Sequence, residues 1–219
     1  MKFHINTVSP VLLDVLKTIM VIDELSSFRL VGGTCLSLLM GHRISVGIDL
    51  FTDAAYGSID FEKIDQIFMK TFDHVELGFG RNHSMGESYL IGKSQDEVVK
   101  VDLYYTDPFI FPLMELEGIR LAQLEEITAM KLDVIGRNGR KKDFWDLHEL
   151  LEYFSLQQML DFYERRYPYS FPKEVILKKM IDFKEAEDDF EPICLKNKYW
   201  ELIKLDIEET VKQEFNFLS

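Results

Sequence analysis

The sequence predicts a mixed α/β protein of the α+β class, in which an α/β core is followed by a helical C-terminal region. Short apolar runs with the two-residue period of strands are concentrated between residues 28 and 105. After Pro108 and Pro112 the apolar residues recur at helical spacing instead. We therefore expect two domains, an α/β core over residues 1–115 and a helical region over residues 116–219 that packs on it.

The composition suits a globular protein that does not bind nucleic acid in bulk. The chain has 219 residues, of which 47% are hydrophobic and 29% are charged. Its formal net charge of −13 opposes sequence-independent attraction to a polyanion, so any contact with RNA must be local. The candidate local patch consists of Arg137, Arg140, Lys141 and Lys142, although a basic run between helices is also typical of a solvated turn.

Neither the cysteines nor the N-terminal apolar stretch indicates a secreted or membrane protein. Cys35 and Cys194 lie far apart and lack the paired spacing of a zinc site or a disulfide framework. The apolar stretch over residues 11–22 is interrupted by Asp14 and Lys17 and is too short to span a bilayer. We expect an amphipathic helix there, a cytoplasmic location and no membrane partner.

A strand, a turn and a helix follow one another early in the chain. Residues 28–31 form an apolar run that Gly32 and Gly33 stop, and residues 34–40 have helical character with Thr34 near the N-cap. Backbone N–H groups of glycines before a helix N-terminus can hold a triphosphate, since the helix end favours anions. A Gly-Gly pair is also ordinary turn chemistry, so this motif needs partners before it indicates function.

Two predicted strands carry one aspartate each. Asp49 and Asp102 both lie on the face opposite the aliphatic row of their own strand. These rows are Ile44, Val46, Ile48 and Leu50 in the first strand and Val99, Val101, Leu103 and Tyr105 in the second. If the two strands are neighbours, both carboxylates can reach one Mg²⁺ or Mn²⁺. Either aspartate alone is typical of a solvated strand, but the pair together with the glycine turn predicts phosphoryl chemistry.

The remaining elements are assigned by their periodicity. We expect further strands over residues 75–79 and 88–91, joined through a polar turn over residues 81–87, and helices over residues 59–71, 121–135, 143–154, 156–166, 172–183 and 197–213.

Two charged residues fall on the apolar stripes of predicted helices. The stripe around Lys131 consists of Leu124, Ile127 and Val134, and the stripe around Asp143 consists of Leu147, Leu150 and Phe154. Burial of an unpaired charge is costly, so Lys131 is a candidate phosphate ligand and Asp143 a candidate organiser or base. A structural salt bridge between them, or a simple preference of Asp143 for a helix N-terminus, explains the pattern equally well. Arg43 is a candidate to direct positive charge at a phosphate, whereas His42 is expected to be a turn residue.

As an ordered set, these motifs resemble the AbiEii/AbiGii toxin family, which has a nucleotidyltransferase fold and is found beside antitoxin genes and in phage-defence loci. The matching segments are residues 31–38 (VGGTCLSL), 41–52 (GHRISVGIDLFT), 101–103 (VDL), 130–132 (MKL) and 140–147 (RKKDFWDL).

The resemblance implies a polymerase-β-like nucleotidyltransferase core with a mixed sheet. Such a core transfers an NMP from an NTP to an RNA or protein acceptor, and an antitoxin partner is encoded nearby. A glycine turn would hold the NTP phosphates, an Asp-x-Asp strand and a third Asp would bind divalent metal, a Lys would contact phosphate, and a later Asp would support catalysis. The residues that match these roles are Gly32, Gly33, Thr34, Asp49, Asp102, Lys131 and Asp143.

One position departs from the family pattern. Gly47 stands where the family has the first Asp of its Asp-x-Asp pair. Residues i and i+2 lie on one face of a strand, roughly 6.5 Å apart, and there they can grip a metal pair. The two remaining aspartates predict one weakly held Mg²⁺ or Mn²⁺. The expected function is nucleotidyl transfer impaired by Gly47, and the alternative is an inactive nucleotide-binding or partner-binding member. A third interpretation is that Gly47 is an engineered or accidental substitution in an otherwise active member.

Overall fold

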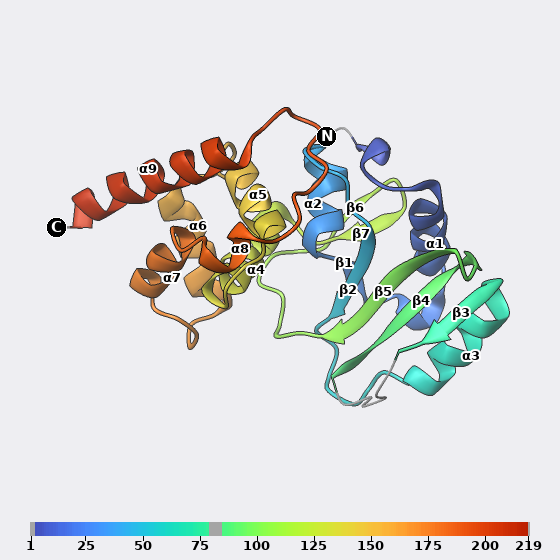
Figure 1. The fold of residues 1–219 in the computed structure, drawn as a ribbon. Helices are drawn as coiled ribbons and strands as arrows, with labels where there is room; N and C mark the ends of the chain where they lie inside the picture. Colours follow the sequence, from blue (N-terminus) through green and yellow to red (C-terminus); the bar gives the residue numbers. More distant parts are fainter. Residues whose placement is uncertain (1–2, 79–84, 219) are drawn as a thin grey trace. The chain divides into compact units, whose positions relative to one another are not determined.

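A computed structural model describes residues 3–78 and 85–218, which form two compact units (Figure 1). The first unit contains the chain up to Leu39 and Ser45–Ala122, and the second contains Met40–Ile44 and the chain from Gln123 onward. The chain therefore enters the second unit for five residues, returns, and enters it again. The predicted functional division into residues 1–115 and 116–219 stays a prediction.

The first unit is built on a mixed sheet, which confirms the predicted fold class. Its described strands lie in the order β3-β4-β5-β2-β1-β7-β6. Their bounds are β1 Arg29–Leu30, β2 Gly47–Thr52, β3 His74–Leu77, β4 Gly86–Ser94, β5 Glu97–Tyr105, β6 Met114–Leu116 and β7 Ile119–Leu121. The β2–β5 and β1–β7 pairs are parallel, and the other neighbouring pairs are antiparallel.

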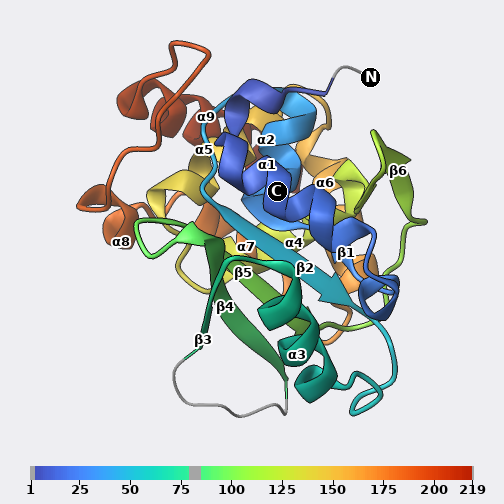
Figure 2. The same ribbon diagram turned by 90° about the vertical axis from the view of Figure 1, so that its right-hand side faces the viewer.

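Helices α1 and α3 cover one face of this sheet, in front of the strands in Figure 2. The helices of the unit are α1 Pro10–Met20, α2 Gly32–Met40 and α3 Phe61–Thr71, with short 3-10 helices at Ile5–Thr7 and Asp23–Leu25. Phe68 of α3 packs edge-on against Tyr89 of β4 with ring centroids 5.0 Å apart. The Tyr89 hydroxyl donates to Asp65 at 2.9 Å, which satisfies the polar end of a buried ring.

Arg120 of β7 donates hydrogen bonds to the chain between the end of α1 and the start of β1. Its guanidinium donates to the carbonyl oxygens of Met20 at 2.7 Å, Leu25 at 2.9 Å and Phe28 at 2.9 Å. These carbonyls end α1 and precede β1, so one planar side chain satisfies backbone groups that would otherwise need water.

Several predicted boundaries near β1 and β2 are wrong. The strand predicted from Ile44 begins at Gly47, and Val46 is 78% exposed rather than part of a buried row. The cause is backbone pairing, because the Ile44 N–H donates to the Ile193 carbonyl and the Ser45 N–H to the Thr7 carbonyl before the ladder with β5 begins. Helix α2 starts at Gly32, so the two glycines form its first turn rather than a separate turn before it.

The hairpin of β6 and β7 was not predicted, and Leu121, expected to open a helix, ends β7 instead. Its turn has positive φ at Glu117 and Gly118, the geometry of a tight hairpin turn. Phe79 and residues 81–84 of the predicted polar turn lie outside the described residues.

The second unit is helical, as predicted. Its helices are α4 Leu124–Gly136, α5 Lys141–Leu150, α6 Leu156–Arg166, α7 Lys173–Met180, α8 Lys184–Glu187 and α9 Trp200–Leu218. Helix α4 packs against α5, α6 and α7, and α9 packs against the same three helices. Trp145 of α5 stacks on Trp200 of α9 with centroids 5.8 Å apart and an interplanar angle of 8°. Among the described residues no helix is long and apolar enough to cross a membrane.

Candidate active site

The register between β2 and β5 brings the two strand aspartates together. The strands are parallel neighbours, and Asp49 and Asp102 are direct partners across the pair. Side chains of directly opposed residues lie on the same face of a sheet. The condition on which the metal prediction depended, that the two strands are neighbours, is therefore confirmed. In the same register Gly47 is opposite Lys100.

Asp102 is held by two side chains on that face. The Ser88 hydroxyl donates to Oδ1, and the Lys100 ammonium lies 2.5 Å from Oδ2. Ser88 Oγ also lies 3.1 Å from the Tyr104 hydroxyl. The Asp102 side chain is 15% exposed, so it is not fully closed off from solvent.

Gly32 brings the N-terminus of α2 directly against Asp49. Gly32 has φ +66°, a conformation that favours glycine, and an added Cβ would lie only 2.6 Å from Asp49 Oδ2. The Val31 N–H donates to the Asp49 carbonyl at 2.9 Å and fixes the same approach from the backbone. The first turn of α2 is therefore packed directly against the Asp49 carboxylate.

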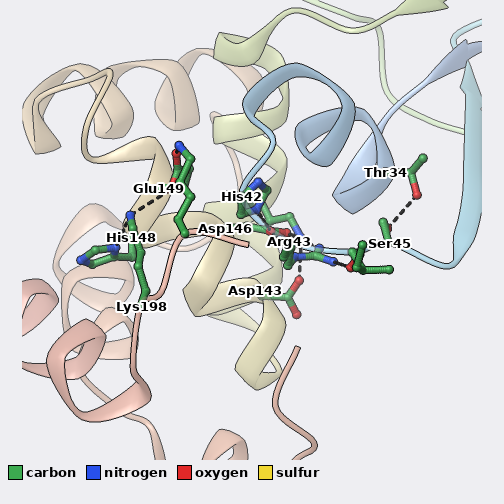
Figure 3. Close-up of polar contacts among 12 residues, drawn as sticks. Thr34, His42, Arg43, Ser45, Asp143, Asp146, His148, Glu149 and Lys198 are labelled. Atoms are coloured by element: carbon green, nitrogen blue, oxygen red, sulfur yellow. Dashed lines mark hydrogen bonds and ion pairs between the residues drawn. The ribbon is translucent and has the colours of Figure 1, made fainter. Parts of the chain in front are cut away.

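Thr34 joins the start of α2 to the segment that enters β2. It is 1% exposed, and its hydroxyl bonds the Ser45 hydroxyl at 2.8 Å and the Gly47 carbonyl. The Thr34 and Ser45 side chains face each other in Figure 3. Because the hydroxyl is occupied by the protein, a contact of Thr34 with phosphate would use its backbone N–H.

The second unit contains a buried cluster of five charged or ionisable side chains, His42, Arg43, Lys131, Asp143 and Asp146. Asp146 is fully buried and receives bonds from Arg43 at 2.7 and 2.9 Å and from His42 at 2.8 Å (Figure 3). Lys131 Nζ lies 2.7 Å from Asp146 Oδ2 and 2.6 Å from Asp143 Oδ1. Every charge of the cluster therefore has a partner of opposite sign.

The pKa values within the cluster follow from this pairing. Burial by itself raises the pKa of Asp146, yet the charges of Arg43 and Lys131 and the bonds from His42 and Arg43 hold that pKa well below its ordinary value. Burial by itself lowers the pKa of Lys131, but Asp146 and Asp143 outweigh it and raise that pKa. Both groups are therefore charged at neutral pH.

The structure shows both the salt bridge and the helix N-terminal position that were alternative explanations for Lys131 and Asp143. The two side chains form a salt bridge, and Asp143 also accepts from the Arg140 N–H at 3.0 Å as part of the cap of α5. Their catalytic roles, and the role of Arg43 at a phosphate, stay predictions. The sequence reasoning missed Asp146, although it lies three residues after Asp143 in RKKDFWDL and hence on the same helical face.

Most of the predicted basic patch is already paired. Arg137 bonds Asp133 at 2.9 Å, Arg140 bonds Asp189 at 3.3 Å, and the Lys141 ammonium lies 5.4 Å from the Trp200 ring centroid. Burial and the nearby charges of Lys131 and Arg140 lower the pKa of Lys142, although Asp143 opposes them. A patch that binds an RNA acceptor stays a prediction.

Two carboxylates of the sheet can serve as ligands of a divalent ion. Among the residues that the structure describes, no group of three or more His, Cys, Asp and Glu is arranged to hold a metal. Asp49 and Asp102, on adjacent strands, can supply two oxygens, and a hard cation such as Mg²⁺ commonly takes its other ligands from water and phosphate. A single bound ion, and its weak binding because of Gly47, stay predictions.

Comparison with known proteins identifies the family. The family described as nucleotidyl transferase AbiEii toxin, type IV toxin–antitoxin system, matches residues 14–216. The chain belongs to this family. Membership of the AbiEii family implies an NTP substrate and an antitoxin partner, and the nucleotidyltransferases of this family are typically metal-dependent.

Individual relatives agree with the fold. An uncharacterized protein of Aquifex aeolicus is 25% identical over 202 residues, covering 86% of this chain and 88% of the relative. A crystal structure of an H. pylori protein, described as a proposed nucleotidyltransferase, superposes with a TM-score of 0.55 and 18% sequence identity. The match covers 94% of this chain and 93% of the H. pylori chain. The nucleotidyltransferase toxin MenT4 of Mycobacterium tuberculosis has a TM-score of 0.50, 13% identity and coverage of 92% and 83%. The two structural likenesses support the predicted fold of the chain.

The contact between Gly32 and Asp49 predicts a specific cost for adding a Cβ. Gly32→Ala should lose about 1–2 kcal/mol of unfolding free energy from its left-handed backbone, and about 1–3 kcal/mol more because the methyl group displaces the Asp49 carboxylate. Urea denaturation of the purified protein measures the sum.

The matched control is Gly118→Ala. Gly118 has φ +75° but no neighbouring atom within 4 Å of an added Cβ, so this variant carries the backbone cost alone. Equal losses for the two variants would show that Asp49 is not crowded by α2.

The buried cluster predicts a large effect at Asp146. Asp146→Asn should lower the unfolding free energy by about 3–5 kcal/mol at neutral pH, because Arg43 and Lys131 lose a buried counter-charge. Asp206→Asn is the control, since Asp206 is 56% exposed in its pair with His148 and should cost less than about 1 kcal/mol.

The depressed pKa of Asp146 gives this loss a pH dependence. A carboxylate with a lowered folded pKa stabilises the protein above its unfolded pKa, about 4, and loses that contribution as the pH falls toward the folded value. The stability difference between wild type and Asp146→Asn should therefore shrink below about pH 4. A difference that does not change across this range would mean that Asp146 is not ionised in the folded protein.

Proposed function

We propose that this protein transfers an NMP from an NTP to an acceptor hydroxyl, with RNA or protein as the acceptor class. The observation that carries the proposal is the direct opposition of Asp49 and Asp102 across β2 and β5, next to the N-terminus of α2. Family membership supports the NTP as substrate.

In the proposed reaction the protein positions the NTP and the acceptor hydroxyl and supplies the charged groups around the phosphates. The acceptor oxygen forms a bond to the α-phosphorus, the bond from that phosphorus to the bridging oxygen breaks, and pyrophosphate leaves. The hydroxyl proton passes to a carboxylate of the Asp49 and Asp102 pair. The same two residues would hold one Mg²⁺ or Mn²⁺, which when bound supplies Lewis-acid stabilisation of the phosphate oxygens.

Phosphate binding is assigned to the start of α2. The backbone N–H groups of Gly32, Gly33 and Thr34 lie in the first helical turn, where they have no intrahelical acceptor. Gly32 and Gly33 are partly exposed and have no Cβ, so a phosphate can approach the backbone closely.

Lys131 and Asp143 would act from the buried cluster. Lys131 has three N–H donors, and two of them face Asp143 and Asp146. We assign the third donor to a phosphate, with Asp143 orienting the ammonium. Arg43 would contribute positive potential rather than a direct bond, because its guanidinium is already bidentate on Asp146.

A second candidate function is nucleotide or partner binding without turnover. Gly47 favours it, because the strand lacks the first carboxylate of the metal pair. In that case the family's antitoxin, or a nucleotide held at α2, would be bound and not transformed.

The first proposal is tested by label transfer. The full-length protein is incubated with radiolabelled NTPs, Mn²⁺ or Mg²⁺ and either cellular RNA or cellular protein. Asp102→Asn should reduce transfer at least about 100-fold, because loss of a metal ligand removes several kcal/mol of transition-state stabilisation. Glu97→Gln on the same strand is exposed and should transfer at the wild-type rate. Absence of transfer to either acceptor class with all four NTPs would refute the proposal.

The second candidate is tested at Gly47. An added Cβ would meet only the Lys100 carbonyl, at 3.6 Å, so the Cβ of an aspartate has room there. If the natural chain only binds, calorimetry will detect ATP binding without turnover, and Gly47→Asp should raise transfer at least about tenfold by restoring a carboxylate. Gly47→Ala controls for the Cβ alone. Wild-type turnover that Gly47→Asp leaves unchanged would exclude this candidate.

A further inference from the structure

Lys100 lies opposite Gly47, the position that the sequence resemblance marks as a departure from the family pattern. It is the direct partner of Gly47 across β2 and β5, and it lies two residues before Asp102 on the same face of β5. Its ammonium is 2.5 Å from Asp102 Oδ2. The side chain is therefore opposite the missing carboxylate and bonded to the remaining one.

We propose that the Lys100 ammonium occupies Oδ2 of Asp102, the oxygen that a second divalent ion would need as a ligand. Lys100 thereby limits the site to one divalent ion. The inference rests on the proposed nucleotidyl transfer and says how the metal is bound. Lys100 is a positioning residue here, because it acts through the Asp102 carboxylate.

The charges on this face favour one ion. Asp49 and Asp102 contribute two negative charges, and Lys100 contributes one positive charge. One divalent ion already leaves the group with an excess positive charge, and a second would add two more at contact distance. An aspartate at position 47 would offset part of that excess, but this chain has Gly47.

The Lys100–Asp102 contact is buried on the side of the carboxylate only. Lys100 is 59% exposed, but Asp102 is 15% exposed and Ser88 donates to its other oxygen, so the orientation of Asp102 is fixed when Lys100 approaches. Lys93 on the neighbouring strand β4 shows the ordinary case of a surface ion pair. Its ammonium is 4.0 Å from Asp14, and both side chains are more than half exposed.

This arrangement predicts how the metal arrives. A free divalent ion must displace or repel the Lys100 ammonium to reach Asp102 Oδ2. A divalent ion bound to a nucleoside triphosphate carries net negative charge, so Lys100 can turn toward the phosphates instead of opposing the ion. The metal should therefore bind weakly alone and more tightly together with the nucleotide.

The test measures Mn²⁺ binding to the full-length protein without nucleotide, from the electron paramagnetic resonance signal of free Mn²⁺. Lys100→Met should tighten binding about tenfold, because a unit charge at contact distance from the ion is removed. Lys100→Arg keeps the charge and should stay within about twofold of wild type, as should the matched surface control Lys93→Met. With ATP present, the advantage of Lys100→Met should disappear.

The outcomes separate this inference from the proposed function. If Asp102→Asn abolishes Mn²⁺ binding but Lys100→Met does not tighten it, the metal site stands and the role of Lys100 is wrong. If Lys100→Met weakens ATP binding and leaves the Mn²⁺ affinity unchanged, Lys100 is a phosphate ligand only, and the inference is also wrong. If Asp102→Asn does not affect Mn²⁺ binding in any background, the proposed metal site itself fails.

Discussion

The parallel pairing of β2 with β5 decides which functional groups of this protein can meet. Since alternate residues of a strand face opposite sides, a slip of one residue would move Asp102 to the face covered by α1 and α3, while Asp49 stayed on the other. The buried rows of both strands oppose such a slip, because it would expose Val101 and Leu103 to solvent. The hydrophobic packing of one face therefore sets the polar chemistry of the other.

The helical unit buries several charged side chains away from water. A buried ion pair is stable only when its partners are complete, since each desolvated charge costs several kcal/mol alone. Here Asp146 meets both Arg43 and Lys131, and Lys131 also meets Asp143. The cluster joins the segment 40–44 to α4 and α5, so its charges act as fasteners between parts of the chain that are distant in sequence.

Periodicity predicted the elements whose environment is uniform. The strand β5 alternates as expected, and α6 has its predicted bounds, because both have one buried face along their whole length. Prediction failed where distant backbone partners decide the structure, as at Ile44 and Ser45, whose N–H groups bond residues 193 and 7. Asp49 and Asp102 were selected because each lies opposite the aliphatic row of its strand, and Lys131 and Asp143 because each lies on the apolar stripe of a helix. Asp146 was not, because its importance depends on Arg43, more than a hundred residues away in sequence.

The assignment of residues 40–44 to the helical unit also has a consequence for the order of events during synthesis on the ribosome. These five residues emerge between α2 and β2, but Asp146, which binds His42 and Arg43, follows 103 residues after Arg43. At common translation speeds that interval is about 5–20 s. This segment must therefore stay hydrated until α5 has been made, because only then can Arg43 be buried against Asp146. Strands β2 and β5 can therefore pair before residues 40–44, which precede β2, form their ion pair with Asp146.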